Sequence, residues 1–280
     1  MKPLISPSKL RIAMAEPTTV VFDCRFSLAD PEEGARAFAQ GHIPSAVYAD
    51  LNRDLSGPVT AGVTGRHPLP QPASFADFLA RSGVTAQSRV IAYDDGNGAF
   101  ASRLWWLCRY VGHDAVQVLD GGWTEWIESG GVSSTDITTR ARGAVEVQLR
   151  PYLVASVAEV DRLRSDPTAR LFDARGADRF RGENETIDPV AGHIPGARSL
   201  PFVDNLKDGK GRSLADLSER YERALGSTAP VQAVVYCGSG VTACHNLLAA
   251  EAAGISGMRL YPGSFSEWIT DPLRPVATGE

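Results

Sequence analysis

The chain has 280 residues, a formal net charge of −5 and four cysteines. This length suits two modest domains, and the acidic balance argues against nucleic acid as the main partner. No run of 18 residues is apolar throughout, so no membrane-spanning segment is expected. The cysteines form no Cys-x-x-Cys pair and no disulfide framework, which favours a reducing, cytoplasmic setting.

The first half of the chain alternates short apolar runs with helical segments. Residues 20–23 and 90–93 are predicted to be buried strands. Residues 75–81 have helical periodicity and are followed by Gly83, a typical helix terminator. Strands that alternate with helices favour an α/β fold with a mainly parallel sheet flanked by helices.

Residues 130–151 separate two halves. They lack helical periodicity and contain Ser133, Ser134 and Thr135 in a row. We therefore predict an N-terminal domain at 1–130, a linker at 131–151 and a C-terminal domain at 152–280. Ser156 and Glu159 have the spacing of a capping box, which predicts the start of a helix.

The second half repeats the first at the scale of a domain. The matching segments are 20–25 with 170–175, 41–46 with 192–197, 75–81 with 217–225, 90–93 with 233–236, and 119–126 with 260–268. The same alternation of strand and helix is therefore expected twice.

Cys237 follows the predicted strand 233–236 and precedes a predicted helix that Gly254 closes. Unpaired backbone N–H groups and the positive end of a helix dipole favour a thiolate at such a turn. An inert buried cysteine is the alternative, but inert cysteines seldom lie in a glycine-rich strand-to-helix turn.

The stretch Cys-Gly-Ser-Gly-Val-Thr-Ala at residues 237–243 resembles the active-site loop of the rhodanese-type sulfurtransferases. Its uncharged form resembles the 3-mercaptopyruvate branch of that family. The resemblance covers nearly the whole chain and implies two tandem rhodanese-like domains. It also implies a cysteine that takes sulfur from a donor, holds it as a persulfide and passes it on. Asp94 stands where the second copy has Cys237, and a carboxylate cannot carry sulfane sulfur, so the N-terminal domain is expected to be catalytically silent.

The resemblance further implies residue roles. Cys237 is the expected nucleophile, and the loop residues expected to bind the substrate are Gly238, Gly240, Val241 and Thr242. Arg179 corresponds to the arginine that holds the anionic end of the donor. Residues 183–189 lack the second arginine of the animal 3-mercaptopyruvate enzymes, and Arg181 is a candidate substitute. This acidic loop is also expected to repel a dianionic donor.

Ser239 and His67 correspond to the serine and histidine of a proton relay described for that branch. Asn52 takes the position of the relay's aspartate, where it could orient an imidazole but not stabilise its cation as a carboxylate does. Alternatively, His67 only lines the site. His42 and His193 are expected to brace turns, and the histidine spacings predict no metal site. No cofactor is expected.

The implied reaction uses 3-mercaptopyruvate, or less well thiosulfate, as donor and a thiol, thioredoxin or cyanide as acceptor. A thiosulfate sulfurtransferase is the main alternative. A phosphatase on the same fold needs an arginine six residues after the cysteine, where this chain has Ala243. A non-catalytic binding module is the third possibility, and the intact loop around Cys237 argues against it.

Overall fold

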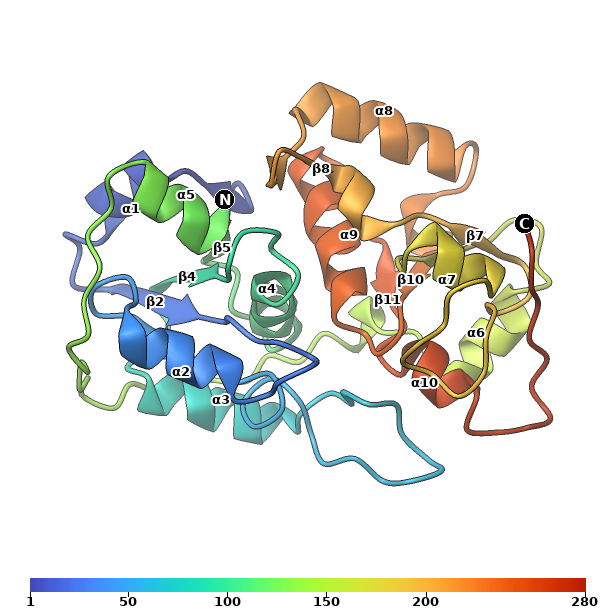
Figure 1. The fold of residues 1–280 in the computed structure, drawn as a ribbon, viewed down its shortest axis with the longest axis horizontal. Helices are drawn as coiled ribbons and strands as arrows, with labels where there is room; N and C mark the ends of the chain where they lie inside the picture. The colour runs from blue at the N-terminus through green and yellow to red at the C-terminus, as the bar shows by residue number, and fades with distance from the viewer. The chain divides into compact units, whose positions relative to one another are not determined.

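The computed structural model describes all residues from Met1 to Glu280 and separates into two compact units (Figure 1). The first unit comprises Met1–Gly57, Pro70–Arg150 and Asp208–Gly211. The second comprises Pro58–Leu69, Pro151–Lys207 and Arg212–Glu280. A short segment from the first half of the chain, Pro58–Leu69, therefore belongs to the second unit.

The first unit contains a five-stranded parallel sheet in the order β1-β5-β4-β2-β3. The strands are β1 (Leu4–Ile5), β2 (Thr19–Asp23), β3 (Val47–Tyr48), β4 (Arg89–Tyr93) and β5 (Val116–Leu119). The helices are α1 (Pro7–Ala13), α2 (Glu33–Gln40), α3 (Pro72–Arg81), α4 (Ala101–Tyr110) and α5 (Gly122–Glu128). Both predicted strands and the predicted helix of this half are confirmed. The helix begins earlier than predicted, at Pro72, because proline fits the first helical turn.

The second unit contains a four-stranded parallel sheet in the order β11-β10-β6-β7. The strands are β6 (Arg170–Asp173), β7 (Ala197–Ser199), β10 (Ala233–Tyr236) and β11 (Arg259–Leu260). The helices are α6 (Val157–Leu163), α7 (Ala177–Arg181), α8 (Leu214–Leu225), α9 (Thr242–Ala252) and α10 (Ser264–Trp268). The order β5-β4-β2-β3 of the first sheet matches β11-β10-β6-β7 of the second, so the repeated sequence gives a repeated topology.

The remaining elements are short. They are the 3₁₀ turns η1 (Pro151–Leu153), η2 (Phe202–Asn205) and η3 (Pro230–Gln232), and the strands β8 (Leu206–Lys207) and β9 (Lys210–Gly211). Residues 131–150 form no helix or strand. They run along the first unit, where Ser134 exchanges backbone hydrogen bonds with His42 and Gly143 donates to Ala80.

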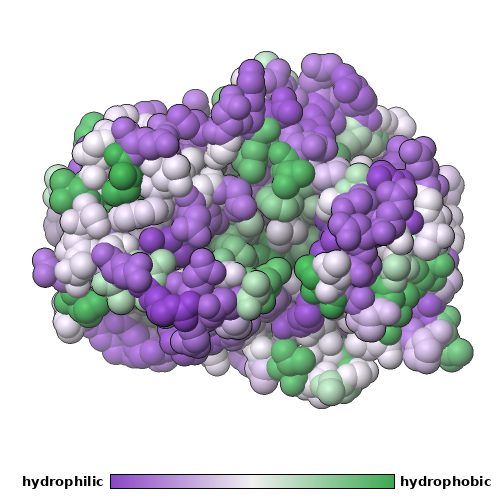
Figure 2. All heavy atoms as spheres, viewed as in Figure 1, coloured by the Kyte–Doolittle hydropathy of each residue, from purple (hydrophilic) through white to green (hydrophobic).

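Strands β2 and β10 are buried along their whole length, as expected when helices cover both faces of a parallel sheet. The capping box is confirmed, because the Ser156 hydroxyl accepts from the Glu159 N–H and the Glu159 carboxylate accepts from the Ser156 N–H. No helix has the length and apolar character needed to cross a bilayer. Hydrophilic residues predominate on the face shown in Figure 2.

Each unit has a buried ion pair at the end of one sheet strand, β2 in the first unit and β6 in the second. Arg25 donates to Asp23 at 2.6 Å in the first unit, and Arg175 donates to Asp173 at 2.6 Å in the second. Arg175 also donates to the carbonyl of Gly192 at 2.7 Å. By pairing with Asp173 and with this carbonyl, Arg175 locks the turn.

The repeated histidines also have matching environments. His42 bonds through Nδ1 to the carbonyl of Phe38 at 2.8 Å, and His193 to that of Phe180 at 2.7 Å. Each imidazole stacks on the ring of the same phenylalanine. These contacts support the interpretation that both histidines brace turns.

Candidate active site

Cys237 lies between the end of β10 and the start of α9, and its side chain is buried. The helix begins at Thr242, so residues 238–241 form the loop between the strand and the helix. The Cys237 Sγ accepts a hydrogen bond from the Gly240 N–H at 3.1 Å. Such a bond stabilises negative charge on sulfur, so the turn favours a reactive thiol.

Gly240 makes this geometry possible. Its φ angle is +77°, in the left-handed region where a side chain is unfavourable. A Cβ atom at Gly240 would lie 2.3 Å from the carbonyl oxygen of Pro262, which is far too close. Only glycine can therefore direct this N–H toward the sulfur of Cys237 without moving the backbone.

The beginning of α10 fixes the loop from the other side. The Ser264 hydroxyl accepts from the Cys237 N–H at 3.1 Å. The N–H groups of Phe265 and Ser266 donate to the carbonyls of Cys237 and Gly238 at 3.0 and 2.9 Å. Ser264 was not predicted from the sequence, and its φ of +57° is unusual for a residue with a side chain. This conformation places both its hydroxyl and the following N–H groups against the loop.

The structure brings Ser239 and His67 together. His67 Nδ1 lies 2.8 Å from Ser239 Oγ, within hydrogen-bond distance, and both side chains are buried. His67 belongs to the segment Pro58–Leu69, which is part of the second unit. The Arg66 N–H donates to the Ser266 hydroxyl at 3.1 Å and holds this segment in place. Asn52, by contrast, belongs to the first unit and is exposed to solvent.

Arg179, on α7, is held by two carboxylates. Its Nε and Nη2 donate to both oxygens of Glu185 at 3.0 and 2.9 Å, and Nη2 also donates to Asp188 at 2.9 Å. Arg181 instead pairs with Glu183 at 2.7 Å, and both are partly exposed. The structure therefore gives the suggested role of Arg181 no support.

Arg66 was not singled out from the sequence. Its Nη1 forms an ion pair with Asp188, whose carboxylate is fully buried. A Cβ atom built on Gly238 would lie 2.8 Å from Arg66 Nη2 and 3.7 Å from either terminal nitrogen of Arg179, so both guanidinium groups border the loop. The only sequence signal was its position directly before His67.

These residues complete a row of alternating charges. It runs Asp173, Arg175, Glu185, Arg179, Asp188, Arg66, and each member forms an ion pair with the next. Burial raises the pKa of Asp188 above its usual range, and this effect outweighs the nearby arginines. Burial would also raise the pKa of Glu185, but the Arg179 guanidinium and two backbone N–H groups lower it overall. The acidic loop was expected to repel a dianionic donor, but Glu185 and Asp188 are instead buried against arginines.

The turn after β4 shows the equivalent position in the first unit. Asp94 is buried, and its carboxylate accepts four backbone N–H bonds, from Gly96, Gly98, Phe100 and Ala101, at 2.9–3.1 Å. Burial raises the pKa of Asp94 although these N–H groups favour its charged form. Both turns thus direct backbone N–H donors at the residue after the strand, four at the Asp94 carboxylate and one, from Gly240, at the Cys237 sulfur.

The comparisons with known proteins agree with this geometry. Residues 6–129 and 156–271 each match the model of the Rhodanese-like domain. The chain belongs to the rhodanese family. A relative from Pseudomonas aeruginosa, named as a 3-mercaptopyruvate sulfurtransferase, is 48% identical over 99% of this chain and 98% of its own length. Another from Mycobacterium tuberculosis, named as a thiosulfate sulfurtransferase, is 38% identical over 96% of this chain and 93% of its own length.

Solved structures of rhodanese-fold enzymes agree as well. The crystal structure of the 3-mercaptopyruvate sulfotransferase SseA from Escherichia coli superposes with a TM-score of 0.83 at 30% identity. It covers 95% of this chain and all of its own. A 3-mercaptopyruvate sulfurtransferase from Leishmania major gives a TM-score of 0.83 at 31% identity, over 98% of this chain and 75% of its own. The predicted fold of two rhodanese domains, each with a parallel sheet flanked by helices, is confirmed.

The other cysteines of this rhodanese chain lie in different surroundings. All four cysteines are free and buried. Burial raises the pKa of Cys24 and of Cys108, which keeps these thiols protonated. Cys244, on α9, donates its S–H to the carbonyl of Gly240 at 3.3 Å.

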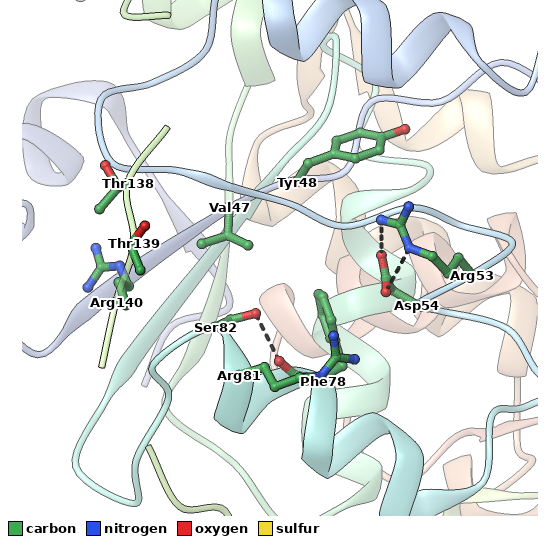
Figure 3. Close-up of a pocket in the computed structure, with 10 residues that line it drawn as sticks. All are labelled: Val47, Tyr48, Arg53, Asp54, Phe78, Arg81, Ser82, Thr138, Thr139 and Arg140. Carbon is green, nitrogen blue, oxygen red and sulfur yellow. Dashed lines mark hydrogen bonds and ion pairs between the residues drawn. The ribbon is translucent and has the colours of Figure 1, made fainter. Parts of the chain in front are cut away.

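A cavity of about 380 Å³ lies in the first unit (Figure 3). Its lining residues are Val47, Tyr48, Arg53, Asp54, Phe78, Arg81, Ser82, Thr138, Thr139 and Arg140. Two of its three arginines already pair with carboxylates, Arg53 with Asp54 and Arg81 with Asp77. The lining includes no cysteine, so this cavity is no alternative location for thiol chemistry.

Proposed function

We propose that this chain is a sulfurtransferase that moves sulfane sulfur from 3-mercaptopyruvate to a thiol or to cyanide through a persulfide on Cys237. The observation that carries the proposal is the Cys237 turn, where the Gly240 N–H donates to the sulfur beside the bonded pair Ser239 and His67. The equivalent turn of the first unit holds Asp94, so we assign the chemistry to the second rhodanese domain alone.

In the first half-reaction, the Cys237 thiolate attacks the sulfur of 3-mercaptopyruvate. A sulfur–sulfur bond forms, and the carbon–sulfur bond breaks with its electron pair on carbon, which gives the enolate of pyruvate. The Ser239 hydroxyl, hydrogen-bonded to His67, supplies a proton to that enolate, and pyruvate leaves. Arg179 holds the donor carboxylate during these steps.

In the second half-reaction, an acceptor attacks the outer sulfur of the persulfide. The sulfur–sulfur bond breaks, its electrons return to Cys237, and the acceptor leaves as thiocyanate or as a persulfide. A small thiol, reduced thioredoxin or cyanide can each play this part. A reducing compartment such as the cytoplasm suits this cycle, because the thiolate must be regenerated in every turnover.

We further propose that 3-mercaptopyruvate is preferred over thiosulfate. The loop residues Gly238, Ser239 and Gly240 carry no charge to stabilise departing sulfite. The two arginines beside the loop are balanced by Glu185 and Asp188, which suits a monoanion better than a dianion. We expect kcat/KM for 3-mercaptopyruvate to exceed that for thiosulfate at least about tenfold. A thiosulfate preference in parallel assays with cyanide would make thiosulfate sulfurtransferase the better assignment.

Intact-protein mass spectrometry tests the main proposal. Incubation with 3-mercaptopyruvate should add the mass of one sulfur atom, peptide mapping should place it at Cys237, and cyanide should remove it. Cys237→Ala should fold and take up no sulfur, whereas the control Cys108→Ala should behave like the parent protein. Sulfur that maps elsewhere, or thiocyanate production by Cys237→Ala, would refute the assignment. A phosphatase is a poor alternative, because Ala243 stands where its phosphate-binding arginine belongs.

A further inference from the structure

Ser264 adopts an unusual backbone conformation at a position where the first unit has a glycine. The segments 119–126 and 260–268 correspond, and Gly122 is the counterpart of Ser264. The φ angles of Gly122 and Ser264 are +56° and +57°, both in the left-handed region. Glycine adopts this conformation readily, whereas a serine is destabilised by it. The second unit therefore carries a strained serine at a position that favours glycine.

The backbone after this position makes the same contact in both units. In the first unit, the Trp123 N–H donates to the Asp94 carbonyl at 2.7 Å. In the second, the Phe265 N–H donates to the Cys237 carbonyl at 3.0 Å. A Cβ atom at Gly122 would lie 2.4 Å from the Asp94 carbonyl oxygen, so the first unit forms its contact with no room for a side chain. Glycine is thus sufficient for this hydrogen bond.

The hydroxyl group is what the serine adds. It accepts from the Cys237 N–H at 3.1 Å and donates to the Tyr261 carbonyl at 3.0 Å, and Ser264 is fully buried. Since the Phe265 N–H binds the Cys237 carbonyl, two consecutive residues hold both backbone polar groups of the expected nucleophile. Strained conformations that persist in folded proteins cluster at functional sites, and this one places a hydroxyl directly on the nucleophile's backbone.

The turn that carries the thiol needs this support more than the silent one does. The Asp94 carboxylate accepts four backbone N–H bonds, so its side chain is fixed by its own contacts. The sulfur of Cys237 accepts one, from Gly240. The direction of the sulfur therefore depends more strongly on how the Cys237 backbone is held.

We propose that Ser264 is a positioning residue for sulfur transfer, whose hydroxyl fixes the Cys237 backbone so that the sulfur stays aligned with the Gly240 N–H and with the incoming donor. The assignment rests on the sulfurtransferase function proposed above. Ser264 acts through Cys237 and not on the donor itself. Backbone strain at Ser264 is thus accepted where it aligns the nucleophile, and it is absent from the equivalent turn that has no thiol.

Two substitutions separate the hydroxyl from the backbone conformation. Ser264→Gly removes the hydroxyl and suits the left-handed φ, whereas Ser264→Ala removes the hydroxyl and keeps the strain. Both should lower the rate of Cys237 alkylation by iodoacetamide about three- to tenfold, as expected for one neutral hydrogen bond. Ser264→Ala should have the lower unfolding temperature of the two.

A single turnover with 3-mercaptopyruvate distinguishes positioning from donor binding. Persulfide formation on Cys237 is followed by rapid quenching and intact-protein mass spectrometry at increasing donor concentration. Its limiting rate should fall by the same factor as the alkylation rate in both variants. The half-saturating donor concentration should stay within about twofold of that of the parent protein, because Ser264 does not bind the donor.

Ser45 offers a matched control in the first unit. Its φ is +63°, its counterpart in the repeat is Gly196, and its hydroxyl lies 3.4 Å from Arg140 Nη2. Ser45→Gly and Ser45→Ala should show the same order of unfolding temperatures as the Ser264 variants. Both should leave the alkylation rate of Cys237 unchanged.

Parent rates of alkylation and persulfide formation in folded Ser264→Gly would overturn the proposal, because the hydroxyl would then be dispensable. Equal slowing in Ser45→Gly would overturn it too, since relief of strain elsewhere would have the same effect. Failure of the sulfurtransferase proposal looks different. The parent protein would then gain no sulfur from 3-mercaptopyruvate, while the iodoacetamide rates would still report whether Ser264 positions the thiol.

Discussion

Gly240→Ala tests how the Cys237 loop activates its thiol. The added methyl group would lie 2.3 Å from the Pro262 carbonyl oxygen, and the φ of +77° is itself unfavourable for alanine. The left-handed conformation alone costs about 1–2 kcal/mol, and the clash forces the backbone to move. Such a movement removes the 3.1 Å hydrogen bond from the residue 240 N–H to sulfur. A hydrogen bond to a charged group contributes about 1.5–3 kcal/mol, so the rate of Cys237 alkylation by iodoacetamide at pH 7 should fall roughly tenfold to hundredfold.

Gly254→Ala is the matched control for this experiment. Gly254 also has a left-handed φ, +86°, but no heavy atom would lie within 4 Å of its added Cβ. It should therefore lower the thermal stability by the conformational cost alone and leave the Cys237 rate unchanged. Alkylation rates and unfolding midpoints of both variants decide the matter. If Gly240→Ala kept the parent rate, or lost only as much stability as Gly254→Ala, the sulfur would not depend on this N–H group.

Three further predictions concern Ser239, Asp94 and Glu185. Ser239→Ala should lower kcat with 3-mercaptopyruvate by about 10²-fold through loss of proton transfer. It should leave the rate of Cys237 alkylation by iodoacetamide nearly unchanged. Equal losses in both assays would indicate a structural role for Ser239 instead. Asp94→Ala leaves four backbone N–H groups without their acceptor and should destabilise the protein by at least about 2 kcal/mol. Turnover per folded molecule should stay within about twofold of that of the parent protein, since this domain lacks the thiol. The pKa of Glu185 is lowered in the folded protein, so the ionised carboxylate stabilises the fold above its unfolded pKa, and this stabilisation is lost as the pH falls through the folded pKa. Between pH 7 and pH 4, the unfolding temperature of the parent protein should therefore drop more than that of Glu185→Gln. Equal drops in the two proteins would contradict a lowered pKa for Glu185.

Sequence periodicity was a good guide to the regular elements. The strand 233–236, the helix after Gly238-Ser239-Gly240 and the pair Asp173 and Arg175 all follow from local patterns, which the structure reproduces. Each of these features depends on residues that are close in the chain, so a single sequence contains the information.

The partners of the loop residues were harder to predict. Arg66 lies in an irregular segment, and no periodicity indicates that this segment joins the second unit. The sequence likewise suggested that the acidic loop at 183–188 repels a dianionic donor, whereas Glu185 and Asp188 are buried against arginines. Ser264 was missed because its role depends on a left-handed backbone conformation that is rare for serine. Tertiary pairing of charges in irregular segments is set by the packed structure and not by local propensity.

The row of alternating charges from Asp173 to Arg66 affects how this site can change during evolution. Arg66 is the last member of the row, so its loss only shortens the row. Arg179 lies inside the row, and its loss divides the row into the acidic fragment Asp173, Arg175 and Glu185 and the neutral pair Asp188 and Arg66. The stranded charge is largely buried, so the second change is the more costly. Substitutions along the row should therefore be strongly epistatic. A mutation that is harmful alone can be tolerated after its neighbour has changed, and donor specificity can then drift by paired exchanges while the Cys237 turn stays fixed.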